Sequence, residues 1–226
     1  MNMKYLSGCF FSKPNKIFNI SSHRTGTTSF GDFLEQFGFK RASYAIAKKN
    51  NWSVNWYDGE YDLIFDSKDF KNHQVFEDDP WYFGNFYIEI YKRYPQSKFI
   101  LVERPANDWF SSLMSHSNGR SLGNTMIHAK IYGRMEELNL LNPDYYNKSI
   151  VTMTPDNLLS LENMKDHYIE YYNQRNIEIK AFFAEKAPNN FLVVDLYSEE
   201  KWIQISEFLN FRIPENYDIH SHKSKS

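Results

Sequence analysis

The chain has 226 residues, of which 42% are hydrophobic and 24% are charged, and its formal net charge is −2. This length and composition suit one folded unit, so we expect residues 1–226 to form a single domain, with an irregular lead-in at 1–14 and a flexible tail at 215–226. The charge offers no basic field for a nucleic-acid partner, and no apolar run is long enough to cross a membrane. Cys9 is the single cysteine, which excludes an internal disulfide and predicts a reducing, cytoplasmic location.

Short apolar runs alternate with amphipathic segments along the chain. We predict strands at 16–21, 73–77, 98–103 and 191–196, the first and the last of them buried. The predicted helices cover 27–38, part of 61–70, 81–94 with Pro80 near its start, 106–116, part of 119–130, much of 156–186, and a final stretch that Ser198 caps. The apolar faces of the first and last helices are predicted at Phe30, Phe33, Leu34 and Phe37, and at Trp202, Ile205, Phe208 and Leu209.

Strands that are apolar throughout are typical of parallel sheets covered by helices on both faces. The sequence therefore predicts an α/β fold, a three-layer α/β/α domain with a central, mostly parallel sheet. Ligands bind such sheets beyond the carboxyl ends of the strands. Four polar segments follow predicted strands, and we expect them to meet at one edge of the sheet: residues 22–29, the acidic turn 77–80, Arg104 and Asp195.

Residues 22–29, SHRTGTTS, have the layout of a phosphate-binding loop between a strand and a helix. Backbone N–H groups at a helix N-terminus attract anions, and Gly26 permits a positive φ or a close approach to a ligand. Arg24 adds a charged fork that suits phosphate-type oxygens. Hydroxyl donors come from Thr25, Thr27, Thr28 and Ser29.

The alternative interpretation of this loop is a capped helix, in which Thr27 or Thr28 is the N-cap and Arg24 is solvated. A Walker A loop carries a lysine where this chain has Thr27, so an ordinary ATPase is disfavoured.

The order strand–[K/R]-x-G-T-T–helix, followed later by strand–Arg-x7-Ser, resembles the sulfotransferase superfamily, in a bacterial-type soluble form. The resemblance implies a P-loop-like nucleotide-binding fold and 3′-phosphoadenosine 5′-phosphosulfate (PAPS) as the sulfuryl donor. Residues 24–29 look like the family's loop for the 5′-phosphosulfate, with Arg24 in place of the more frequent lysine. Arg104, Asp108 and Ser112 keep the spacing of the family segment R-x-P-x-D-x-x-x-S, which grips the 3′-phosphate.

The late stretch NFLVVDLYSEEKWIQISEFLNFRIP is also similar to this family. The Gly-rich basic segment that closes over the adenosine in hormone-type members has no counterpart. Lys223 and Lys225 in the tail take over that contact, or the tail is disordered.

In-line sulfuryl transfer needs a group that neutralises charge on the leaving oxygen and a base that takes the acceptor proton. The resemblance implies Arg24 for the first role. For the base it implies Asp78, two places before Pro80, with Glu77 and Asp79 beside it. Repulsion among three carboxylates predicts a raised pKa for one of them. The alternative is a solvated acidic turn that caps the helix 81–94.

Two histidines are further candidates for the site. His23 adjoins the loop and contacts the sulfuryl group or the acceptor, or it is a solvated loop histidine. His116 lies one helical turn beyond Ser112. No histidine has metal-ligand spacing with a carboxylate or Cys9, so no metal is predicted. Asp195 resembles the end of a Walker B strand, and we interpret it as a structural turn residue.

The expected partner is a small-molecule or glycan acceptor whose identity the sequence does not reveal. Its pocket is expected in the loops 42–72 and 117–165, and their aromatic residues form either a stacking surface or, as we prefer, an aromatic core: Trp52, Trp56, Tyr57, Tyr61, Tyr132, Tyr145 and Tyr146. Two other functions are compatible with the loop. One is a P-loop nucleotide or small-molecule kinase that uses magnesium and ATP, and the other is a non-catalytic nucleotide-binding relative.

Overall fold

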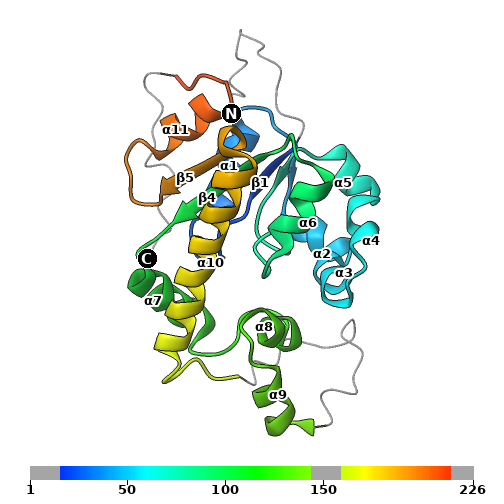
Figure 1. Ribbon diagram of the computed structural model, residues 1–226, viewed down its shortest axis with the longest axis vertical. Helices are drawn as coiled ribbons and strands as arrows, with labels where there is room; N and C mark the ends of the chain where they lie inside the picture. Colours follow the sequence, from blue (N-terminus) through cyan, green and yellow to red (C-terminus); the bar gives the residue numbers. More distant parts are fainter. Residues whose placement is uncertain (1–15, 144–158, 215–226) are drawn as a thin grey trace, which may run out of the picture.

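The computed structural model describes residues 16–143 and 159–214 (Figure 1). Its sheet has five strands in the order β2-β3-β1-β4-β5, and every neighbouring pair is parallel. The strands are β1 (Ile17–Asn19), β2 (Arg41–Ala42), β3 (Val75–Phe76), β4 (Lys98–Glu103) and β5 (Phe191–Asp195). The predicted three-layer α/β/α fold is confirmed. The lead-in 1–14 and the tail 215–226 lie outside the described residues.

The side chains of the central strands enter two separate cores. Along β4, Phe99 and Leu101 belong to one core, whereas Ile100 and Val102 belong to the other. Because successive side chains of a strand point to opposite faces, both faces of the sheet are buried. The second of these cores is closed by α1 (Thr27–Gln36) and α11 (Lys201–Phe208).

The first core is larger and takes side chains from all the remaining helices, α2 to α10. Figure 1 shows α7, α8 and α9 beyond the carboxyl end of β4. The bounds are α2 (Tyr44–Lys49), α3 (Trp52–Asp58), α4 (Tyr61–Phe65), α5 (Lys68–Asn72), α6 (Phe86–Arg93), α7 (Ala106–Ser117), α8 (Thr125–Ile131), α9 (Met135–Leu141) and α10 (Lys165–Lys186), with a short 3₁₀ turn, η3 (Pro188–Asn190), before β5.

Two predicted helix starts are wrong. The helix expected at 81–94 begins at Phe86, because Gly84 has a φ of 43° and so leaves the right-handed helical region. The last helix begins at Lys201 with Glu200 at its N-cap. Ser198 does not cap this helix, because its Oγ accepts from the N–H of Glu200 at 3.2 Å, in a turn before the helix.

The prediction that strand 191–196 is buried is also wrong. Strand β5 stands at the edge of the sheet, with β4 as its one neighbour. Of its five residues only Val194 is buried, and Val193 is 36% exposed. An apolar run such as FLVVD can form a central strand or an edge strand. The exposure of β5 is therefore determined by its position in the strand order.

The aromatic residues of the segment 42–72 are mainly structural. Trp52 and Trp56 are buried in the larger core, and so is Tyr132, which follows α8. The preferred interpretation of an aromatic core is therefore confirmed for these three, whereas Tyr145 and Tyr146 lie outside the described residues.

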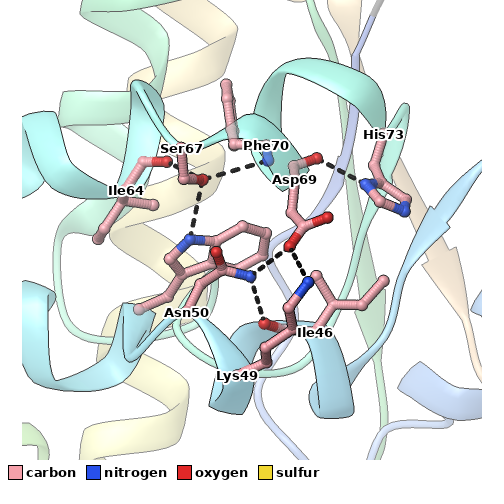
Figure 2. Close-up of polar contacts among 9 residues, drawn as sticks. Ile46, Lys49, Asn50, Ile64, Ser67, Asp69, Phe70 and His73 are labelled. Carbon is pink, nitrogen blue, oxygen red and sulfur yellow. Dashed lines mark hydrogen bonds and ion pairs between the residues drawn. The ribbon is translucent and has the colours of Figure 1, made fainter.

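Polar contacts fix the helices of this segment to one another (Figure 2). The carboxylate of Asp69 on α5 accepts from Lys49 Nζ at 2.9 Å and from Asn50 Nδ2 at 2.8 Å, at the end of α2. Ser67, the N-cap of α5, accepts from the indole N–H of Trp52 on α3 at 3.2 Å. These bonds hold α2 and α3 in place beside the carboxyl edge of the sheet.

Candidate active site at the carboxyl edge of the sheet

The loop between β1 and α1 is closed by its own hydrogen bonds. Thr25 is fully buried, and its Oγ1 donates to the carbonyl of Ser22 at 2.6 Å. This hydroxyl therefore stabilises the loop. Arg24 has a φ of 66°, a left-handed conformation that is uncommon for a residue with a side chain. Such backbone strain is frequent at functional sites.

Gly26 is the N-cap of α1, with a φ of 81°, and no side chain caps the helix. The interpretation in which Thr27 or Thr28 caps it is therefore wrong. A Cβ at position 26 would lie 2.9 Å from Leu196 Cδ1, so a larger residue would displace that side chain and would also be strained by the positive φ. Thr27 is buried, Ser29 is half-buried and Thr28 is exposed. The N–H groups of this first turn keep the partial positive charge of a helix N-terminus.

Arg24 and Arg104 meet at this edge, although 80 residues separate them. Arg104 Nη1 donates to the carbonyl oxygen of Arg24 at 3.1 Å, and Arg24 Nε donates to Ser112 Oγ at 3.3 Å. Together with Asp108 and His116 they line an open groove of about 570 Å³. The structure thus brings Arg24 of the loop and Arg104, Asp108 and Ser112 of the later motif to one concave surface, whereas residues 25–29 are not among the groove's lining residues.

Tyr197 is a residue of this edge that the sequence analysis missed. Its hydroxyl accepts from Arg104 Nε at 3.1 Å and donates to Asp108 Oδ2 at 3.0 Å. It lies just beyond β5, where Asp195 Oδ1 accepts from the N–H of Tyr197 at 2.8 Å. The interpretation of Asp195 as a turn residue is confirmed. Tyr172 also contacts Arg104, through the backbone N–H and C=O at 2.9 and 3.0 Å.

Glu77 of the acidic turn after β3 is buried, Asp78 and Asp79 are half-buried, and the turn does not cap α6. Glu77 accepts from Arg41 Nη2 at 2.7 Å and from Arg41 Nε at 3.0 Å, while Arg41 also pairs with Asp32. Burial raises the pKa of Glu77 to about 7 even though Arg41 opposes the shift. The interpretation of a solvated cap is wrong, and Glu77 is engaged in a structural ion pair.

Asp78 and Asp79 occupy different surroundings in the same turn. Burial raises the pKa of Asp78, while the nearby Arg41 and Arg24 act in the opposite direction. Burial, and then the charge of Asp78, raises the pKa of Asp79 to about 8. Asp79 Oδ2 accepts from Ser53 Oγ at 3.3 Å. Desolvation, rather than the repulsion expected from the sequence, is thus the main cause of both shifts.

A second cavity, of about 650 Å³, opens beside the acidic turn. Asp78, Asp79 and His23 line it, and His116 lines both this cavity and the arginine groove. We call it the side pocket. His116 therefore marks the place where the two hollows adjoin, and burial followed by the charge of Arg24 lowers its pKa.

His23 is buried, so the interpretation of a solvated loop histidine is wrong. Its ring lies 4.8 Å from that of Tyr82, and Nε2 lies 3.3 Å from the hydroxyl of Tyr132. Its carbonyl accepts from Trp109 Nε1 at 2.9 Å. Burial lowers the pKa of His23 to about 3, which keeps the imidazole neutral at physiological pH.

No cluster of three potential metal ligands occurs within 16–143 and 159–214. In the same part of the chain, every helix is too short or too polar to cross a lipid bilayer.

Comparison with known families identifies the family of this chain. The profile of a family described as a sulfotransferase domain matches residues 16–225. This stretch includes the 22–29 loop, the acidic turn and the segment 104–112. No curated protein matches the chain.

Proposed function

Because the chain belongs to the sulfotransferase family, we propose that it moves a sulfuryl group from PAPS to a hydroxyl or amine of a small-molecule or glycan acceptor. The observation that carries the proposal is the meeting of Arg24 and Arg104 at one groove. None of the ion pairs among the described residues involves either guanidinium. Two unpaired cations beside a helix N-terminus suit a ligand with two separate anionic groups.

In this proposal the loop and the segment after β4 share the donor. The backbone N–H groups of 25–28 and the side chain of Arg24 hold the 5′-phosphosulfate, assisted by the hydroxyls of Thr27, Thr28 and Ser29. Arg104 and Ser112 hold the 3′-phosphate. PAPS supplies an activated sulfuryl group when bound. Arg24 then neutralises the charge that develops on the leaving phosphate oxygen, which is the main electrostatic demand of such a transfer.

We assign the general base to Asp78. Glu77 is held by Arg41, and Asp79 has a pKa of about 8 and is therefore largely protonated at neutral pH. Asp78 lines the side pocket and is close enough to Arg24 for its charge to be felt. The acceptor oxygen or nitrogen bonds to sulfur as the bond from sulfur to the bridging phosphate oxygen breaks. The acceptor proton passes to Asp78, and adenosine 3′,5′-bisphosphate leaves.

Ligand-induced thermal stabilisation tests the donor site. Adenosine 3′,5′-bisphosphate without magnesium is expected to raise the Tm, since a ligand at 100 times its Kd adds about 2.7 kcal/mol to the free energy of unfolding. Arg104→Ala is expected to remove this shift. Arg93→Ala is the matched control, because Arg93 forms its ion pairs with Glu89 and Asp62 on the surface of α6.

The same titration separates the competing functions. If magnesium and ATP stabilise the protein and the bisphosphate does not, a kinase replaces the sulfotransferase. An unchanged response in Arg104→Ala would reject the 3′-phosphate assignment alone. Transfer of radiolabel from PAPS to a mixture of acceptors then distinguishes an enzyme from a non-catalytic relative.

A further inference from the structure

The side pocket has a polar end and an apolar body. Its polar end lies at the acidic turn, where Asp78, Asp79, His23 and His116 line it. Side chains from α2, α3, α8 and the adjoining turns line the rest. The apolar ones are Ala47, Val54, Phe83, Leu122, Ile127 and Ile131, and the polar ones include Tyr44, Asn51, Ser53, Asn124 and His128. Cavities of ~300–1,000 Å³ with this mixture of surfaces are typical of sites for small molecules.

The charges in the pocket disfavour negatively charged acceptors. Two carboxyl groups line the pocket, and because Asp79 is largely protonated at neutral pH, Asp78 carries the negative charge. No arginine lines the pocket, and Lys48 is the one lysine that does. Lys48 is exposed to solvent. Sites that recognise carboxylates and sulfates use convergent arginines and lysines, and a buried carboxylate repels an anion strongly because little water screens the charges. An acidic acceptor is therefore disfavoured.

We propose that the side pocket is the acceptor site and takes a small compound with an apolar body, a reacting hydroxyl or amine, and no negative charge. The reacting group lies at the polar end, between Asp78 and the arginine groove, with His116 at the boundary. This inference rests on the proposed sulfotransferase function and narrows its acceptor.

Three phenols that differ mainly in charge test the inference: tyramine, 4-ethylphenol and 4-hydroxyphenylacetate. Each is offered to the full-length protein with radiolabelled PAPS, and heparosan is offered as an acidic glycan. We expect kcat/KM for tyramine and 4-ethylphenol to exceed that for 4-hydroxyphenylacetate by about tenfold or more, because the anion meets a carboxylate at short range. No label is expected in heparosan.

Substitutions in the wall provide a second, independent test. Val54→Arg places a large cation in the apolar body and is expected to abolish transfer to 4-ethylphenol while the bisphosphate still stabilises the protein. Leu122→Arg repeats the test from another segment in case the first variant does not fold. Val193→Arg, on the exposed edge strand, is the matched control and is expected to change neither property.

Several results would overturn the inference. They are equal or faster transfer to 4-hydroxyphenylacetate, labelling of heparosan alone, full activity in both wall variants, and no labelled phenol despite clear stabilisation by the bisphosphate. Failure of the bisphosphate to bind is different, because it rejects the sulfotransferase function itself.

Discussion

Tyr197 offers the sharpest test of the proposed 3′-phosphate site. Its hydroxyl joins Arg104 Nε, at 3.1 Å, to Asp108 Oδ2, at 3.0 Å. Tyr197→Phe removes both hydrogen bonds and leaves the ring in place. Arg104 then loses one of the contacts that aim it into the groove, and its guanidinium becomes free to pair with Asp108 directly. Both effects weaken the binding of an anion by Arg104.

The magnitude follows from the exposure of the group. Hydrogen bonds to charged groups contribute about 1.5–3 kcal/mol when buried, but pairs on the surface contribute ~0.2–1 kcal/mol. Tyr197 is 53% exposed, so we expect a net loss of about 1 kcal/mol, which is roughly a fivefold rise in the Kd of adenosine 3′,5′-bisphosphate.

Calorimetry on two ligands isolates the effect. Adenosine 5′-phosphate lacks the 3′-phosphate, so its Kd is expected to change less than about twofold. The Kd of adenosine 5′-phosphate divided by that of the bisphosphate is therefore expected to fall about fivefold in Tyr197→Phe. Tyr91→Phe is the matched control, because the hydroxyl of Tyr91 donates to the carbonyl of Lys186 at 2.9 Å, away from the groove. Equal weakening of both ligands, or no weakening of either, would refute the reasoning.

Three further predictions follow from the same edge of the sheet. Gly26→Ala is expected to lower the free energy of unfolding by about 1–2 kcal/mol and to weaken bisphosphate binding. Alanine is strained at the positive φ of this position, and its Cβ meets Leu196. Gly59 has a similar φ, and a Cβ added there would have no atom within 4 Å, so Gly59→Ala should leave binding unchanged. Equal losses of binding in both variants would contradict a specific role for the space around Gly26. Asp79→Asn is expected to flatten the pH dependence of stability measured by urea unfolding. Because the pKa of Asp79 rises from 3.8 when unfolded to about 8 when folded, the folded state holds the extra proton between these values, and wild-type stability falls as the pH rises through them, by roughly 1–3 kcal/mol. The same fall in the variant would show that Asp79 does not cause it. Asp78→Asn should keep bisphosphate binding and lose transfer by about 100-fold or more, and retained turnover would reject Asp78 as the base.

The sequence predicts the parts of the fold that local pattern controls. β4 matches its predicted range, 98–103, because an uninterrupted apolar run between polar ends specifies a buried central strand. The same argument fails for 191–196, where the run is equally apolar and the strand lies at the edge. Strand order depends on contacts between distant segments, and a single run of residues does not report it.

The candidate site divides in a similar way. Arg24 and Arg104 are evident in the sequence because each belongs to a motif, and the parallel sheet places both at one edge. Tyr197 belongs to no motif, and it reaches Arg104 only because β5 pairs with β4 in register, Asp195 beside Glu103. His23 looks like any loop histidine until the rings of Tyr82 and Tyr132 are known to surround it.

The distribution of charge across this edge links the two hollows to one reaction. The groove has two cations, Arg24 on the loop and Arg104 at the end of β4, and the adjoining pocket has the carboxylate of Asp78 beside the largely protonated carboxyl group of Asp79. In the proposed reaction, a donor with two phosphate-type groups is attracted by the two arginines and repelled by Asp78, so we expect it in the groove. An uncharged acceptor is not repelled, and we expect it beside Asp78. The proposed transfer then takes place at the boundary, where Arg24 would balance the charge of the leaving group and Asp78 would receive the proton. If the carboxylate lay beside the donor and the arginine beside the acceptor, the charge of the leaving group would not be balanced and the acceptor proton would have no base. Arg24 and Asp78 are therefore best tested together.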